Sequence, residues 1–76
     1  KIKFYPNPVS NLLSIVSEKP IGKVSIVNTL GIVVLTKEGS SSNQETVSMG
    51  GLTPGVYILI ISSENSVPEK ALIIKK

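Results

Sequence analysis

The stretch Leu52-Thr53-Pro54-Gly55-Val56-Tyr57-Ile58-Leu59-Ile60-Ile61 combines a turn with an apolar run. Pro54 presets the φ angle of the second turn position, and Gly55 can take the positive φ that a type II turn requires at its third position. The residues after Gly55 are β-branched or aliphatic except for Tyr57, and such residues favour strands. This stretch therefore predicts a turn followed by a buried strand, with Leu52 covering the turn.

Short segments of strand character continue on both sides of this stretch. Prolines, glycines and the small polar run at residues 39–43 separate them, and no amphipathic helical window is present. This pattern predicts an all-β fold, an Ig-like Greek-key antiparallel β-sandwich of about seven strands. The expected strands cover residues 2–5, 12–17, 23–28, 32–37, 45–49, 56–62 and 70–75.

The alternation of apolar and polar residues predicts which side chains form the core. Ser14, Ser25 and Ser48 mark the polar face of their strands. The strand at residues 56–62 is apolar on both faces, which indicates a central strand that loops partly cover. The expected core residues are Leu13, Ile15, Val24, Ile26, Val47, Met49, Tyr57, Leu59, Ile61, Leu72 and Ile74.

Two connections have recognisable turn chemistry. Asn28-Thr29-Leu30-Gly31 joins two expected strands, and its last residue, Gly31, can adopt the left-handed conformation that closes a short hairpin. Asn28 can cap this turn through its side-chain oxygen. Near the start, the prolines of Tyr5-Pro6-Asn7-Pro8 lack an N–H and push their predecessors into extended geometry. This segment is therefore expected to form a rigid corner after the first strand.

Length and composition exclude several classes of function. The chain of 76 residues allows one small domain, and it contains no His, Cys, Asp, Arg or Trp. Zinc sites of the usual kinds cannot be assembled, and the five glutamates lack calcium-loop spacing. The net charge of +3 comes from lysine against glutamate, and the chain lacks the arginines and the exposed aromatics typical of nucleic-acid binding. We therefore expect no enzyme activity, no cofactor, no metal and no nucleic-acid partner.

In order and spacing, these features resemble the C-terminal sorting domain of proteins exported by the bacterial type IX secretion system. The resemblance extends over essentially the whole chain. Asn28 departs from it, because that family commonly has Asp there, and Ile32 stands where it often has a basic residue. The residues that match the sorting motifs are Tyr5, Pro6, Asn7, Pro8, Gly31, Leu52, Gly55, Tyr57, Lys70, Lys75 and Lys76.

The resemblance implies a role for the domain. Residues 1–76 would form the C-terminal sorting domain of a larger exported protein, with a cargo domain on the N-terminal side. The expected partners are the type IX translocon and sortase-like outer-membrane proteins, one of which would remove the domain. The expected location is the periplasm in transit, and then the outer-membrane surface or the extracellular space.

Two other functions stay open from the sequence. The domain could be a small Ig-like adhesive or carbohydrate-binding module, which the absence of Trp and the scarcity of aromatic residues weaken. It could also be a passive spacer. Each motif residue has a purely structural explanation as well: the glycines and prolines serve turns, Tyr57 serves the core, and the terminal lysines are edge-strand charges.

Two further expectations concern the surface. Lys75 and Lys76 are expected to be exposed terminal residues that tolerate substitution. Residues 56–61 form an uncharged apolar run of high β-propensity. This run predicts weak self-association through sheet edges, or aggregation on mild destabilisation.

Overall fold

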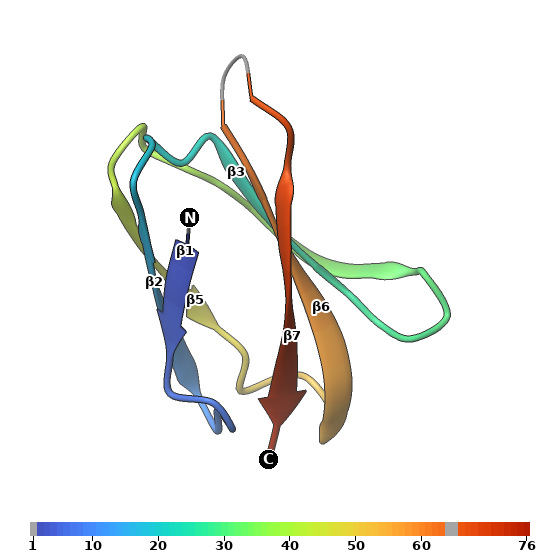
Figure 1. Cartoon of the computed structure of the whole chain (residues 1–76). Helices are drawn as coiled ribbons and strands as arrows, with labels where there is room; N and C mark the ends of the chain where they lie inside the picture. Colours follow the sequence, from blue (N-terminus) through green and yellow to red (C-terminus); the bar gives the residue numbers. More distant parts are fainter. Residues whose placement is uncertain (1, 64–65) are drawn as a thin grey trace.

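The computed structural model describes residues 2–63 and 66–76 and contains seven strands and no helix within them (Figure 1). The predicted all-β class is confirmed, and every strand bound agrees with its prediction to within one residue. The strands are β1 (Ile2–Tyr5), β2 (Leu12–Ser17), β3 (Lys23–Val27), β4 (Val33–Glu38), β5 (Gln44–Ser48), β6 (Gly55–Ser62) and β7 (Glu69–Lys75).

The strands form two antiparallel sheets, one with the order β1-β2-β5 and one with the order β4-β3-β6-β7 (Figure 1). β2 and β5 pair with each other although the β3–β4 hairpin separates them in sequence, and β6 returns to pair with β3. These non-consecutive pairs produce the Greek-key arrangement of an Ig-like sandwich. β6 lies between β3 and β7, which confirms that the doubly apolar strand is central.

The core lies between the two sheets. Leu52 packs against it and is partly buried, as expected. Two core residues come from connections and were not predicted: Val9 follows the proline corner, and Ile21 precedes β3. Both are fully buried, because these connections cross the open ends of the sandwich. The buried core residues are Val9, Leu13, Ile15, Ile21, Val24, Ile26, Val47, Met49, Tyr57, Leu59, Ile61 and Ile73.

The predicted inner face of β7 is wrong. Leu72 and Ile74 are 60% and 43% exposed, whereas Ile73 is fully buried and Lys75 is only 7% exposed. In the β6–β7 ladder, Ile73 is the partner of Tyr57, which faces the core. Since directly opposite residues share a face of the sheet, the pairing turns Ile73 inward and Leu72 outward.

The β3–β4 hairpin has the predicted turn. The N–H of Gly31 donates to the carbonyl oxygen of Asn28 at 3.0 Å, and Gly31 has a φ of 85°. The side-chain oxygen of Asn28 accepts hydrogen bonds from the N–H groups of Leu30 at 2.9 Å and Ile32 at 3.0 Å. The cap proposed for Asn28 is therefore present, and a left-handed glycine closes the turn.

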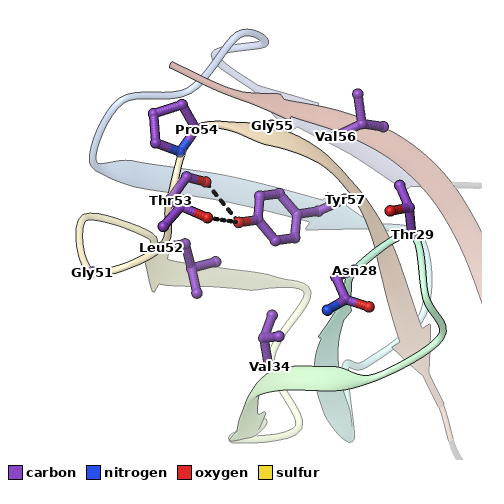
Figure 2. Close-up of a pocket in the computed structure, with 10 residues that line it drawn as sticks. All are labelled: Asn28, Thr29, Val34, Gly51, Leu52, Thr53, Pro54, Gly55, Val56 and Tyr57. Atoms are coloured by element: carbon purple, nitrogen blue, oxygen red, sulfur yellow. Dashed lines mark hydrogen bonds between the residues drawn. The ribbon is translucent and has the colours of Figure 1, made fainter.

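The β5–β6 connection carries the chain from one sheet to the other, and the Tyr57 hydroxyl secures it (Figure 2). This hydroxyl donates to the carbonyl oxygen of Thr53 at 2.6 Å and lies 3.1 Å from the Thr53 Oγ1. A tyrosine whose hydroxyl bonds back to the backbone a few residues upstream is a hallmark of Ig-like sandwiches. The predicted role of Tyr57 as a core aromatic is confirmed, and the hydrogen bonds of its hydroxyl to Thr53 were not predicted.

The type II turn predicted at Pro54 and Gly55 is wrong. The hydrogen-bonded turn lies earlier, where the N–H of Leu52 donates to the carbonyl oxygen of Met49 at 3.1 Å. Gly55 does have a positive φ, but its value of 155° is far from the value of about 80° in a type II turn. Gly55 is already the first residue of β6 and pairs with Lys75, so its backbone is more extended than a turn allows.

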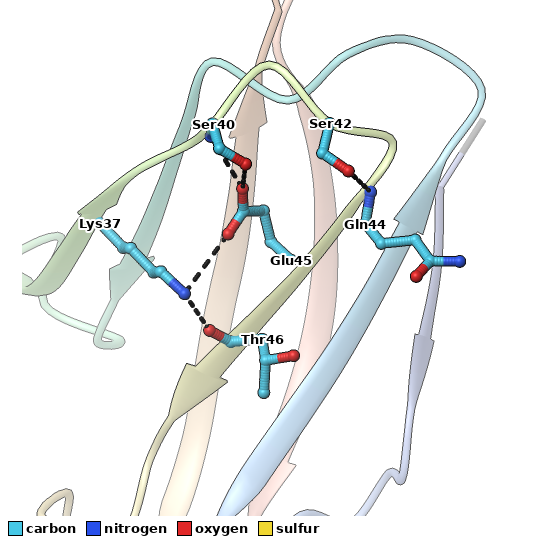
Figure 3. Close-up of polar contacts among 6 residues, drawn as sticks. All are labelled: Lys37, Ser40, Ser42, Gln44, Glu45 and Thr46. Atoms are coloured by element: carbon cyan, nitrogen blue, oxygen red, sulfur yellow. Dashed lines mark hydrogen bonds and ion pairs between the residues drawn. The ribbon is translucent and has the colours of Figure 1, made fainter.

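Polar contacts join the two sheets along the side of the sandwich where the edge strands β4 and β5 lie (Figure 3). Glu45 Oε2 accepts hydrogen bonds from the Ser40 N–H at 2.9 Å and the Ser40 hydroxyl at 3.0 Å. Lys37 Nζ lies 3.3 Å from Glu45 Oε1 and also donates to the carbonyl oxygen of Thr46. The Ser40 N–H, helped by the Ser40 hydroxyl and by Lys37, lowers the pKa of Glu45 below its usual 4.5, although burial opposes this shift.

A matched pair of substitutions tests the direction in which β7 faces. Ile73→Ala should lower the free energy of unfolding by about 2–5 kcal/mol, because it leaves a cavity in the core. Leu72→Ala should lower it by less than about 1 kcal/mol, because the side chain is mostly exposed. Urea unfolding followed by circular dichroism measures both values. A larger loss for Leu72→Ala than for Ile73→Ala would contradict the structure.

The Glu45 contacts should make stability depend on pH. A carboxyl group with a lowered folded-state pKa stabilises the fold above its unfolded pKa, near 4.5, and loses that contribution as the pH falls through the folded pKa. Glu45→Gln should therefore destabilise the protein by about 1 kcal/mol at pH 7. The difference in the free energy of unfolding between this variant and the unsubstituted chain should shrink below about pH 4.5.

Chemical unfolding at a series of pH values measures this difference. Glu38→Gln removes one negative charge from an exposed position on β4 and controls for net charge. A Glu45→Gln effect that stays constant from pH 7 to pH 3 would exclude a contribution from the Glu45 carboxylate.

Candidate functional site

The proline corner and the end of β7 contact each other directly, although they lie at opposite ends of the sequence. Asn7 Oδ1 accepts a hydrogen bond from the N–H of Ile74 at 2.9 Å. The N–H of Val9 donates to the Ile74 carbonyl oxygen at 2.8 Å, and the Lys76 N–H donates to the Val9 carbonyl oxygen at 2.8 Å. Val9 thus forms a parallel bridge with Lys75. The corner carries the chain from the three-stranded sheet to the edge of the four-stranded sheet.

Strand pairing ends at the proline corner, as its prolines predict. Tyr5 is the last residue of β1, so pairing stops where the prolines begin. Both X–Pro peptide bonds in Tyr5-Pro6-Asn7-Pro8 are cis. The Tyr5 side chain is 56% exposed, while Val9, directly after the corner, is fully buried. The corner therefore presents an aromatic side chain to solvent and anchors itself through the next apolar residue.

The three motif lysines differ in burial and in their position along β7. Lys76 is exposed, as expected. Lys75 is buried, which contradicts the expectation that it tolerates substitution, and its Nζ donates to the Lys76 carbonyl oxygen at 2.8 Å. Its aliphatic stem lies on the same face of β7 as Ile73, and the ammonium group reaches the end of the strand. Lys70 is exposed near the start of β7, about 17 Å from Lys75 along the strand.

A groove of about 520 Å³ lies between the β3–β4 hairpin and the β5–β6 connection (Figure 2). Asn28 and Thr29 line it from the hairpin, and Leu52 and Tyr57 line it from the other side. The Tyr57 hydroxyl is already hydrogen-bonded to Thr53. The lining combines aliphatic side chains with polar amide, hydroxyl and backbone groups and contains no charged side chain, so the groove does not suit an ionic ligand.

The described residues provide little for catalysis or metal binding. Residues 2–63 and 66–76 contain no cluster of three or more acidic side chains that could hold a metal ion. No helix in that part of the chain is long and apolar enough to cross a membrane. Of the three aromatic residues, Phe4 and Tyr57 contribute to the core and only Tyr5 is strongly exposed. This arrangement lacks the several exposed aromatic faces typical of sugar-binding platforms.

The structure brings most of the predicted motif residues to one end of the sandwich. Tyr5-Pro6-Asn7-Pro8 contacts the end of β7, where Lys75 pairs with Gly55. Leu52 and Tyr57 border the groove beside the hairpin that Gly31 closes, and Lys70 stands apart. Val9 and Thr53 are contacts that the sequence-based reasoning missed. An apolar residue directly after the proline corner is a signal by which Val9 could have been found.

Comparison with known proteins identifies the family. Residues 3–75 match the family described as the secretion system C-terminal sorting domain, which is the sorting domain of type IX secretion. No curated protein and no solved structure matches the chain. Because the match covers nearly the whole of the 76 residues, it includes every motif residue except Lys76. The chain therefore belongs to the family of type IX secretion C-terminal sorting domains.

Proposed function

We propose that this domain is the address signal of a cargo protein joined to its N-terminal side, and that the type IX translocon reads it at one end of the sandwich. Membership of the family supports a sorting signal for type IX secretion. The observation that carries the finer proposal is the contact between the proline corner and the end of β7. Through it, motif residues from both ends of the chain form one continuous surface.

This surface lies away from the place where cargo would be attached. β1 begins at Ile2 and reaches the corner at its other end, so the first described residue and the corner lie at opposite ends of β1 (Figure 1). Cargo preceding residue 1 would extend from the end of the sandwich opposite the corner. The surface formed by the corner, Gly55 and Lys76 would then stay accessible to a translocon while cargo is attached. We call this surface the corner end.

Processing and location follow from the same arrangement. A sortase-like outer-membrane protease would cut the chain before β1, because the strands themselves are tied into two sheets and offer no extended, unpaired segment to a protease active site. Cargo would pass through the periplasm and finish at the outer-membrane surface or outside the cell. The domain itself would perform no catalysis. The sequence-based alternatives of an adhesive module and of a spacer gain no support from the exposed side chains.

A fusion tests whether the domain is sufficient for sorting. Residues 1–76 attached to the C-terminus of a periplasmic reporter should bring the reporter to the cell surface or the medium in a type IX-competent host. The same fusion should stay periplasmic in a host that lacks the translocon. Removal of residues 70–76 should also stop export, since it exposes β6 and deletes the core residue Ile73. Retention of the intact fusion in the competent host would exclude the sorting role.

A charge reversal separates recognition from folding. Lys75 is unsuitable because it is buried, whereas Lys76 is exposed at the corner end. Lys76→Glu should keep the unfolding midpoint of the isolated domain and lower export of the fusion several-fold. Lys23→Glu reverses an exposed lysine at the start of β3 and is the matched control, which should export normally. Equal export of both folded variants would exclude Lys76 from the recognised surface.

A further inference from the structure

The sandwich has four edge strands, and three of them are protected against pairing with another chain. β1 has only four residues, and Pro6 and Pro8 follow its last residue, Tyr5. β4 has a register shift opposite Val27 and ends in charged residues. On β5, the carbonyl oxygen of Thr46 already accepts a hydrogen bond from Lys37 Nζ. Short length, bulges and charges are the usual means by which edge strands avoid intermolecular pairing.

β7 is the edge strand with the least protection. Its Ile74 has both backbone groups turned away from β6, because the N–H is bonded to Asn7 and the carbonyl to Val9. In an antiparallel ladder, residues two positions apart point their backbone groups the same way. Leu72 and Lys70 therefore also point outward. Within residues 2–63 and 66–76, the outward backbone groups of these two residues have no backbone partner.

The unpaired part of this edge has defined limits. On one side it ends at Ile74, whose outward groups are occupied. On the other side it ends at Pro68, which has no N–H to donate. The free edge thus offers two donors and two acceptors, one of each from Lys70 and Leu72. A partner strand that fits it must form two hydrogen-bonded residue pairs and no more.

We propose that this partner is a second copy of the same chain, paired antiparallel through β7 about a two-fold axis at Ala71. Lys70 of one copy then stands opposite Leu72 of the other, and the reverse pair forms on the other side of the axis. The outward N–H and carbonyl groups of Lys70 and Leu72 are then all hydrogen-bonded in each copy. The next pair on either side would be Pro68 with Ile74. It cannot form, because Pro68 has no N–H and the outward groups of Ile74 are already bonded to Asn7 and Val9. The two four-stranded sheets become one continuous sheet, and the interface is isologous.

The side chains suit this register. Ala71 faces itself in the non-hydrogen-bonded pair, where strands approach to about 4.5 Å between Cα atoms and a small residue fits. Lys70 stands opposite an exposed leucine rather than another lysine, so like charges do not face each other directly. The aliphatic stem of Lys70 can cover Leu72 of the other copy.

The proposal moves self-association to a different strand from the one the sequence indicated. The apolar run at residues 56–61 lies in β6, which pairs with β3 on one side and β7 on the other. Residues 58–61 pair with β3 on one side and with β7 on the other, so the expected edge pairing cannot occur along them. Because the pairing at β7 involves two residues per copy, the interface is far below the roughly 1,200 Å² of stable complexes, and association is weak.

A single cysteine at the proposed axis traps this dimer. The chain has no cysteine, and the Cα separation at a non-hydrogen-bonded pair lies within the range that a disulfide spans. Ala71→Cys should form an intermolecular disulfide under mild oxidation at least about tenfold faster than Ser48→Cys, an exposed control on the protected edge of β5. Equal rates for the two variants would overturn the proposal.

Two substitutions at Leu72 then test the backbone pairing itself. Leu72→Pro removes an N–H that points away from β6, so the ladder within the chain stays intact while pairing with a second copy loses its donor. In the Ala71→Cys background it should reduce disulfide trapping to the Ser48→Cys rate, with a native circular dichroism spectrum. Leu72→Thr keeps the N–H and should retain trapping to within a few-fold.

Two outcomes would count against edge pairing. Unchanged trapping in a folded Leu72→Pro variant would show that the outward N–H is not used. Loss of trapping with Leu72→Thr, at unchanged stability, would show that apolar contact of the outer sheet faces, and not the strand edge, joins the copies. Sedimentation velocity can compare the unsubstituted chain with Leu72→Pro and Leu72→Thr, all without an added cysteine, over a range of concentrations. Self-association should be similar for the unsubstituted chain and Leu72→Thr and weaker for Leu72→Pro.

Discussion

The three hydrogen bonds between residues 7–9 and residues 74–76 hold the two ends of the chain together. Each sheet has its own ladder, but the ladders do not connect the sheets to each other. The segment after the proline corner does so, because it leaves β1 in one sheet and bonds to β7 at the edge of the other. The buried side chain of Val9 adds apolar contact at the same point. A contact between segments so distant in sequence restricts the whole chain between them.

Two other contacts join the sheets at separate places. The Tyr57 hydroxyl fixes the β5–β6 connection through Thr53, and Lys37 reaches from β4 to Glu45 and Thr46 on β5. A chain of this length buries a smaller fraction of its surface than larger domains do, and no disulfide is available. Polar contacts that close the openings of the sandwich therefore matter more here than in a large domain. The same contacts fix the positions of several motif residues.

The position of the motif residues follows from the strand order rather than from their own chemistry. Gly55 and Lys75 meet because β6 and β7 are neighbours, and the corner meets β7 because Val9 has to be buried. Tyr5 and Lys76 remain exposed at this end. The corner end thus combines an aromatic ring, a positive charge and rigid backbone, and under the proposed function the attached cargo would not obstruct it. Such a surface is well suited to recognition by a folded partner.

The sequence by itself determined the class of fold, the strands and most of the core, because alternation and turn residues act locally. It also determined the hairpin at Gly31, whose turn depends on adjacent residues, and the family, whose motifs are spread along the chain. The groove between the β3–β4 hairpin and the β5–β6 connection could not be predicted from the sequence, because the walls of the groove come from separate parts of the chain. The inward face of β7 was also decided by tertiary structure. One face of this strand carries Ala71, Ile73 and Lys75, and the other carries Leu72 and Ile74 and is followed by Lys76. Because both faces are apolar and both lead to a lysine, the sequence pattern is equally compatible with either orientation. Only pairing with β6, whose inner face is fixed by Tyr57, Leu59 and Ile61, turned Ile73 and Lys75 inward and left the free edge at Lys70 and Leu72.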